Sequence, residues 1–188
     1  FEEIAKIFVS TQTLIEAPEK IKISYGLRLE DLLSNRKTTA KAQSTTFTVK
    51  PGGWNYTAVK GGSKASMTAA GASSLLVARN GLGRANFALR QAVDKALVRS
   101  YAWINKNFAS FIQAGGGAHG LYTMYSLEKV GDLGEIEKFG DHNWYVEGAT
   151  ILLDKQQGDG GWAGGYVNTS FAVFFLTRAT RLKPYSAP

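Results

Sequence analysis

Three segments of this chain contain no charged residue and are long enough to form helices: residues 65–78, 120–127 and 167–177. A helix that is apolar around its whole circumference has to be covered by protein on every side. We therefore expect inner helices over residues 66–78, 120–130 and 168–179. This feature constrains the fold strongly, because each inner helix needs neighbours that themselves face water.

Two other segments have the pattern of such neighbours. In the first, apolar side chains recur three or four residues apart, at Val93, Leu97, Tyr101, Ile104, Phe108 and Phe111. In the second, the apolar stripe consists of Tyr145, Ala149, Leu152 and Leu153. This spacing predicts amphipathic helices with one wet face. Because the two kinds of segment alternate, the sequence predicts an all-α fold in which outer helices surround inner ones.

A short motif recurs between outer and inner segments. Its three copies are Gln156, Gly160 and Trp162; Gln113, Gly117 and His119; and Thr48, Gly52 and Trp54. The second copy has histidine in the tryptophan position, and the third has threonine in the glutamine position. Glycine permits the chain to reverse, the amide can bond backbone groups at helix ends, and tryptophan can cover the turn. We therefore predict a structural role for the motif.

The motif resembles the QW repeat of squalene–hopene and oxidosqualene cyclases, whose α/α toroid is shared with protein prenyltransferase β subunits. The chain is most similar to uncharacterised bacterial proteins with such repeats, through residues 53–56, 66–71, 121–131 and 141–148. The resemblance implies one all-α domain, a partial α/α toroid of about four helical hairpins. It covers residues 46–182, with residues 1–45 as a first, less regular hairpin, and it implies a piece of a larger chain.

The catalytic groups of these relatives are missing. No Asp-x-Asp-Asp motif is present to protonate an alkene, and without cysteine the zinc-ligand set of the prenyltransferases cannot form. The chain has only two histidines among its 188 residues. We therefore predict no metal and no cofactor. No apolar run approaches the roughly 18 residues that a transmembrane helix needs.

The net charge of +7 is distributed unevenly. Residues 51–100 hold seven basic residues and one acidic residue, whereas residues 101–150 hold three basic and six acidic residues. A basic surface of this kind can meet nucleic acid, an anionic membrane or an acidic partner. No helix-turn-helix, zinc-finger or RNA-binding signature accompanies it, so we favour a solvated helix face over nucleic-acid binding.

Two clusters are candidate sites. The first contains Asp141, His142, Trp144 and Tyr145; it is either a ligand or acid–base cluster, or the start of a helix with Asp141 as its N-cap. The second contains His119, Tyr122 and Tyr125, which would line a central cavity unless His119 simply packs against its turn. Trp54 and Tyr56 are turn aromatics that could also line such a cavity.

Two functions remain open on this basis. The first is a non-catalytic module that binds a partner protein, or an apolar or glycan ligand, on its concave face. The alternative is a cyclase-like or polysaccharide-lyase-like enzyme that uses His119, Tyr122 and His142 for proton transfer. The enzyme requires the two histidines to meet in one pocket, and the module does not.

Overall fold

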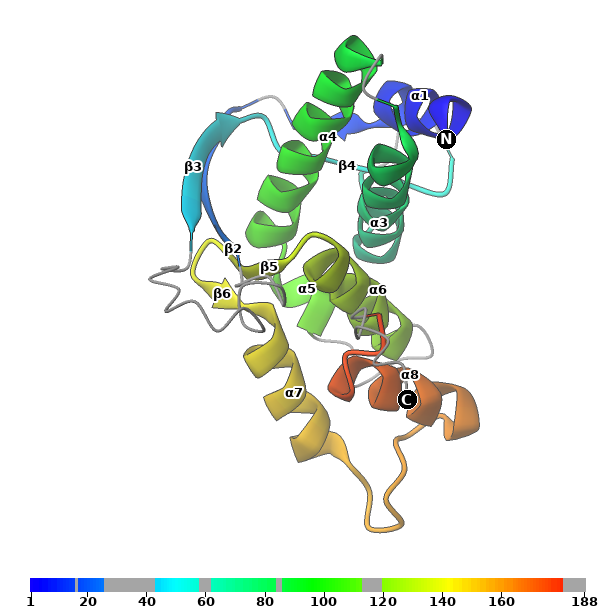
Figure 1. Cartoon of the computed structure of the whole chain (residues 1–188). Coiled ribbons are helices and arrows are strands. Elements are labelled where there is room, and N and C mark those ends of the chain that lie inside the picture. Colours follow the sequence, from blue (N-terminus) through cyan, green and yellow to red (C-terminus); the bar gives the residue numbers. More distant parts are fainter. Residues whose placement is uncertain (16, 26–42, 58–61, 84–85, 113–119, 181–188) are drawn as a thin grey trace, which may run out of the picture.

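The computed structural model describes residues 1–15, 17–25, 43–57, 62–83, 86–112 and 120–180. Its helices are α1 (Glu2–Thr11), α3 (Ala65–Gly81), α4 (Phe87–Lys106), α5 (Ala109–Ile112), α6 (Gly120–Leu133), α7 (Trp144–Lys155) and α8 (Gly165–Leu176) (Figure 1). Its strands are β1 (Thr13–Leu14), β2 (Glu19–Tyr25), β3 (Ser44–Val49), β4 (Gly52–Gly53), β5 (Ile136–Phe139) and β6 (His142–Asn143).

The prediction of an all-α partial toroid is wrong, because the chain is mixed α/β. An antiparallel four-stranded sheet has the order β3-β2-β5-β6, and β1 pairs with β4 in a second, two-stranded sheet. Residues 1–45, expected as a helical hairpin, contain α1 followed by β1 and β2. The local signal is the alternation of exposed Lys20 and Lys22 with buried Ile21 and Ile23, which has the two-residue period of a strand.

The large sheet has one covered and one open face. Ile21, Ile23 and Phe139 are buried on the face that packs against α4. The lysines of β2 and β5 lie on the other face. Antiparallel sheets commonly face water on one side in this way.

The helices pack in a chain of neighbours centred on α6. Helix α3 contacts α1, α4 and α6, while α6 also contacts α7 and α8. Helices α3 and α6 contain two of the uncharged segments. They bury residues on several sides, including Leu75 and Leu127 at 0% exposure. Residues 177–179, expected at the end of the third inner helix, follow α8 instead.

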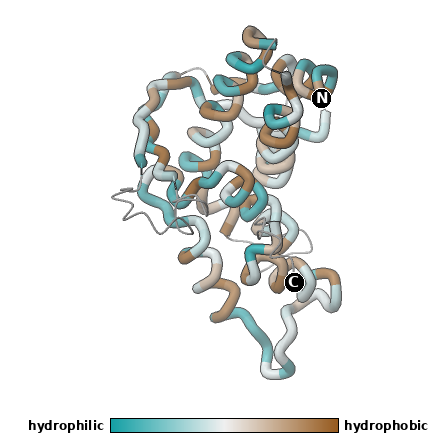
Figure 2. The backbone as a smooth tube through the Cα atoms, viewed as in Figure 1, coloured by the Kyte–Doolittle hydropathy of each residue, from teal (hydrophilic) through white to brown (hydrophobic). Residues whose placement is uncertain are grey.

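Helix α8 is not covered on every side. Tyr166 is 94% exposed, and Val167, Val173 and Phe174 are also exposed. Figure 2 shows the apolar residues that run along α7 and α8. The uniform apolarity of this segment therefore predicted a helix correctly but overestimated its burial.

Two tryptophan turns in the chain have the same set of hydrogen bonds. The Trp162 indole Nε1–H donates to the carbonyl of Leu152, and its backbone N–H donates to Thr169 Oγ1. The Trp54 indole likewise donates to the carbonyl of Phe8, and its backbone N–H donates to Thr68 Oγ1. A threonine near the start of the next long helix thus serves each turn.

The glutamine position of the first turn is filled by Gln12, not by Thr48. The Gln12 amide donates to the carbonyl of Gly52 at 3.4 Å, as the Gln156 amide donates to that of Gly160 at 2.8 Å. Phe8 precedes Gln12 by four residues, as Leu152 precedes Gln156. The two turns therefore correspond, and the first one has β1, β2 and β3 inserted between its glutamine and its glycine.

Candidate functional site

One face of α6 carries an aromatic row that joins it to α8. Tyr122 and Tyr125 lie one turn apart, and both contact Phe171, with ring centres 5.6 and 5.5 Å apart respectively. Tyr125 also contacts Phe174 at 5.4 Å. The Lys129 ammonium, one turn further along α6, lies 4.3 Å from the centre of the Tyr125 ring. The helical spacing of Tyr122, Tyr125 and Lys129 places them on one side of α6.

Lys129 also borders a cavity between α1, α3 and α6. This cavity has a volume of about 360 Å³ and is lined by Phe1, Ile4, Ser73, Ser74, Val77, Ala78, Lys129, Leu133 and Thr180. Ligand pockets commonly occupy roughly 300–1,000 Å³ and combine apolar walls with a few polar groups. Here apolar side chains form most of the wall, and Lys129 is the one charged residue among the described lining residues.

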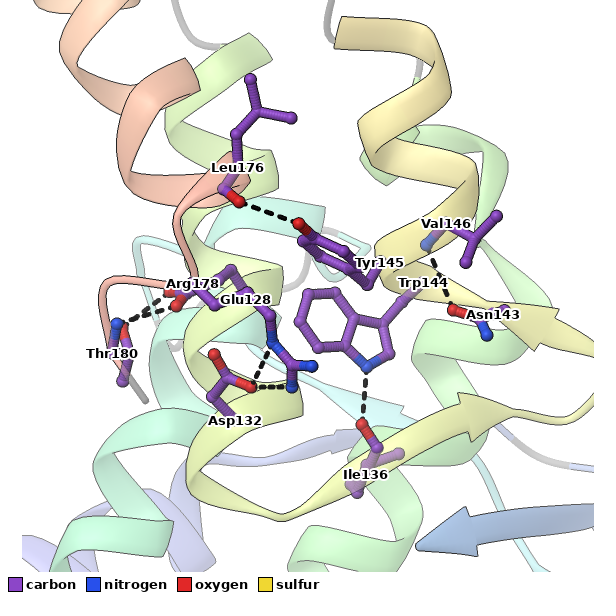
Figure 3. A network of polar contacts seen from close by, with 10 residues as sticks. All are labelled: Glu128, Asp132, Ile136, Asn143, Trp144, Tyr145, Val146, Leu176, Arg178 and Thr180. Atoms are coloured by element: carbon purple, nitrogen blue, oxygen red, sulfur yellow. Dashed lines mark hydrogen bonds and ion pairs between the residues drawn. The ribbon is translucent and has the colours of Figure 1, made fainter. Parts of the chain in front are cut away.

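Beside Lys129 in the sequence, α6 carries two buried carboxylates, Glu128 and Asp132 (Figure 3). Glu128 is fully buried, and its two oxygens accept hydrogen bonds from the backbone N–H and the hydroxyl of Thr180 at 2.8 and 2.7 Å. Asp132 accepts from Arg178 Nε at 2.9 Å and pairs with its guanidinium. These contacts hold the residues after α8 against α6, and so position the Thr180 wall of the cavity.

The surroundings of Glu128 change its pKa. Burial raises the pKa of Glu128 to about 7; the hydrogen bonds from Thr180 oppose that shift, and neighbouring Asp132 adds to it. Asp132 Oδ2 is buried and has no hydrogen-bond partner among the described residues. Arg178 balances the charge of Asp132.

The cluster predicted at residues 141–145 divides between two environments. Trp144 is buried, and its indole donates to the carbonyl of Ile136 at 2.6 Å. The Tyr145 hydroxyl donates to the carbonyl of Leu176 at 2.8 Å. The Arg178 guanidinium lies 5.2 Å from the centres of both rings. These two aromatic residues therefore pack between α7, α8 and the carboxylate pair, as Figure 3 shows.

Asp141 and His142 lie instead at the end of the large sheet. Asp141 is exposed in the turn between β5 and β6 and does not cap α7, because the Asn143 side chain accepts the hydrogen bond from the Val146 N–H. His142 stacks on Phe108 with ring centres 4.1 Å apart, and its Nδ1 lies 3.1 Å from Glu147 Oε2. His142 and Tyr122 thus contact different aromatic partners.

The remaining predicted residues have the following places. Gln113, Gly117 and His119 lie outside the described residues. Trp54 and Trp162 are buried in their turns, whereas Tyr56 is 71% exposed. Gly160 has a φ of +84°, a conformation that favours glycine.

Sequence reasoning missed four charged residues and one hydroxyl residue of the site: Glu128, Lys129, Asp132, Arg178 and Thr180. A signal was present, since Glu128 and Asp132 are spaced by one helical turn and directly follow an uncharged segment. That spacing places two carboxylates on the side of a helix expected to be buried. Among the described residues, no group of three or more potential metal ligands comes together. Within the same residues, no helix is long and apolar enough to cross a membrane.

Comparison of the chain with protein-family models, with curated proteins and with solved structures gives no match.

Proposed function

We propose that this chain is a binding module that takes a ligand with an apolar body and an anionic group in the cavity between α1, α3 and α6. The observation that carries the proposal is the cavity wall itself. Val77, Ala78 and Leu133 offer apolar surface, and Lys129 is the one charged residue among the described lining residues. Apolar area removed from water contributes about 25 cal/mol per Å², so the wall favours a largely apolar occupant.

The charges around the cavity support an anionic group on that occupant. Arg178 is paired with Asp132, and the Glu128 oxygens are both occupied by Thr180. Lys129 is among the residues that line the cavity, and its ammonium contacts the face of Tyr125, one turn back along α6. A carboxylate, sulfonate or phosphate on the ligand would meet this cation where the wall is otherwise apolar.

A binding role accounts for these residues better than an acid–base enzyme does. The described lining residues include hydroxyls and one ammonium, but neither a carboxylate nor an imidazole. Tyr122 packs against Phe171, and His142 packs against Phe108. Glu128, whose pKa suits proton transfer, is separated from the cavity by Thr180.

The test uses 1-anilinonaphthalene-8-sulfonate, an apolar anion whose fluorescence rises in apolar surroundings, and N-phenyl-1-naphthylamine as its neutral counterpart. We expect the anion to bind the native protein, and Lys129→Gln to weaken that binding about tenfold, equivalent to about 1.4 kcal/mol. Binding of the neutral probe should change little. Lys155→Gln, at the exposed end of α7, is the matched control.

Ser74→Trp, which fills the cavity, should weaken the binding of both probes while circular dichroism stays native. If the folded Ser74→Trp protein binds both probes as the parent does, the cavity is not the binding site. If Lys129→Gln and Lys155→Gln have equal effects, the anionic part of the proposal is wrong.

A further inference from the structure

The large sheet has an open edge at β3. In the order β3-β2-β5-β6, β3 pairs with β2 alone among the described strands. The Tyr25 N–H donates to the carbonyl of Gln43 at 2.8 Å, which identifies these two residues as a hydrogen-bonded pair. Such pairs alternate along an antiparallel ladder. Thr45, Phe47 and Val49 therefore direct their backbone groups at β2.

It follows that Ser44, Thr46 and Thr48 direct their backbone N–H and C=O groups away from β2, at the open edge. The pairing of β3 with β2 runs residue for residue over the whole strand, from Glu19 opposite Val49 to Ser24 opposite Ser44. Natural edge strands are commonly protected by a charge, a proline or a bulge. β3 has none of the three within its bounds.

The open face beside this edge is basic. Lys20 lies opposite Thr48, Lys22 lies opposite Thr46, and Lys138 of β5 lies opposite Ser24. Helix α4 covers the other face, where Ile21 and Ile23 are buried.

The acidic residues nearby are few. Glu19 is paired with Lys106. Asp141 shares a hollow of about 280 Å³ with Lys20, Lys22 and Thr46. The register of β5 shifts at Glu137, which is exposed beside Lys138 on a strand that β2 separates from β3. The part of the face next to β3 therefore carries the positive charges of Lys20 and Lys22.

We propose that an extended acidic segment of another protein docks as an added strand on β3. Its backbone pairs with the outward backbone groups of Ser44, Thr46 and Thr48, and its carboxylates lie on the same side as Lys20 and Lys22. Neighbouring strands are about 4.8 Å apart, so one strand with short hydroxyl side chains separates the carboxylates from the lysines. Lysine has a flexible four-carbon stem that spans such a gap. A basic segment would be repelled by the same lysines.

This surface is independent of the cavity between α1, α3 and α6. Backbone pairing supplies affinity in this mode of recognition, and the side chains on alternate positions supply selectivity. The two contributions can therefore be removed separately.

The test uses a fluorescein-labelled peptide of alternating Glu and Val residues, and one of alternating Lys and Val residues as its matched control. We expect anisotropy to show binding of the Glu peptide to the native protein and to Thr46→Val, which keeps the backbone. Thr46→Pro removes an outward N–H at a position where an edge strand tolerates proline, and should weaken binding at least about tenfold. Lys20→Glu with Lys22→Glu should weaken it by a similar factor.

A Glu peptide that is N-methylated at the residues facing β3 removes the same hydrogen bonds without changing the protein, and should also fail to bind. The proposal is overturned if the Glu peptide does not bind the native protein, or if the Lys peptide binds it as tightly as the Glu peptide does. It is also overturned if the Glu peptide binds Thr46→Pro as tightly as the native protein and the methylated peptide binds the native protein as tightly as the unmethylated one. It is also overturned if the protein self-associates through β3, since a second copy would then occupy the edge. Failure of these arms leaves the cavity proposal intact, because the fluorescent naphthalene probes test that separately.

Discussion

The two tryptophan turns use equivalent hydrogen bonds but are closed in different ways. In the second turn, Gln156 and Gly160 are four residues apart, and local bonds such as that from the Gln157 N–H to the Gly161 carbonyl support it. In the first turn, Gln12 and Gly52 are 40 residues apart. The first turn therefore depends on contacts between distant segments, while the second depends mainly on its own loop.

The surroundings of the two glutamines differ as well. The Gln12 amide also donates to the carbonyl of Ala96 in α4 at 2.9 Å, so it links three parts of the chain. The Gln156 side chain is exposed, and water competes for its hydrogen bond. The comparison shows that one hydrogen-bond pattern can organise the core at one end of the molecule and merely shape a surface loop at the other.

The largest losses of stability should come from replacing the tryptophans, which are buried in both turns. Both indoles are about 5% exposed or less, so Trp54→Ala and Trp162→Ala should each lower the free energy of unfolding by about 3–5 kcal/mol. Trp54→Ala should lie at the upper end, because that ring packs on Gly71 and against Phe8. Urea denaturation measures both, with exposed Tyr56→Ala as the control. A Trp162→Ala protein of unchanged stability would show that its turn contributes nothing to the fold.

The stability of the protein should depend on pH through Glu128, which contacts Thr180 after α8. The pKa of Glu128 is raised from 4.5 to about 7, so the folded state holds its proton more tightly than the unfolded chain does. Its stabilising contribution is complete below about pH 4.5 and is lost as the pH rises to about 7, at a rate of at most about 1.4 kcal/mol per pH unit.

The matched variant for this titration is Glu128→Gln, which cannot ionise. Urea denaturation between pH 4.5 and 8 should show a smaller loss of stability for this variant than for the parent. Parallel curves for the two proteins would contradict the assignment of Glu128 as the titrating group.

The glutamines should distinguish the turns directly. Gln12→Ala should cost about 1–3 kcal/mol, because the carbonyls of Gly52 and Ala96 lose a partner in a half-buried setting. Gln156→Ala should change stability by less than about 0.5 kcal/mol, since water replaces its bond. Chemical denaturation of the two variants side by side measures the difference. Equal costs would break the distinction between a core turn and a surface turn.

The smallest expected difference in stability between the two turns comes from replacing their threonines. Thr68 is fully buried, and Thr68→Val leaves the Trp54 N–H without its acceptor, at a cost of about 1–2 kcal/mol. Thr169 is half-buried, and the same change there should cost about 0.5–1 kcal/mol. Hydrogen exchange at the two tryptophan amides gives an independent measurement. A larger increase in exchange at the Trp54 amide in Thr68→Val than at the Trp162 amide in Thr169→Val would support the ranking, and the reverse order would refute it.

Sequence reasoning found the elements whose signals are local. The uncharged segments at residues 65–78 and 120–127 lie within α3 and α6, and Tyr122 and Tyr125 occur together on one face. It missed the sheet, because β2 is a short alternating segment beside long helical patterns. It also missed Glu128 and Asp132, because a charged residue next to an apolar helix normally marks a solvated surface.

The amino-acid pattern by itself determined that residues 65–78, 120–127 and 168–176 are helical and that glycine and tryptophan recur at the turns. These follow from side-chain periodicity and backbone preference, which act between residues close in sequence. Only the tertiary structure decided that Gln12 completes the Trp54 turn, that β2 pairs with β5, and that Glu128 is buried under Thr180. Those contacts join residues that are far apart in the chain, and they form only when the packed surfaces of the helices and the sheet bring them together.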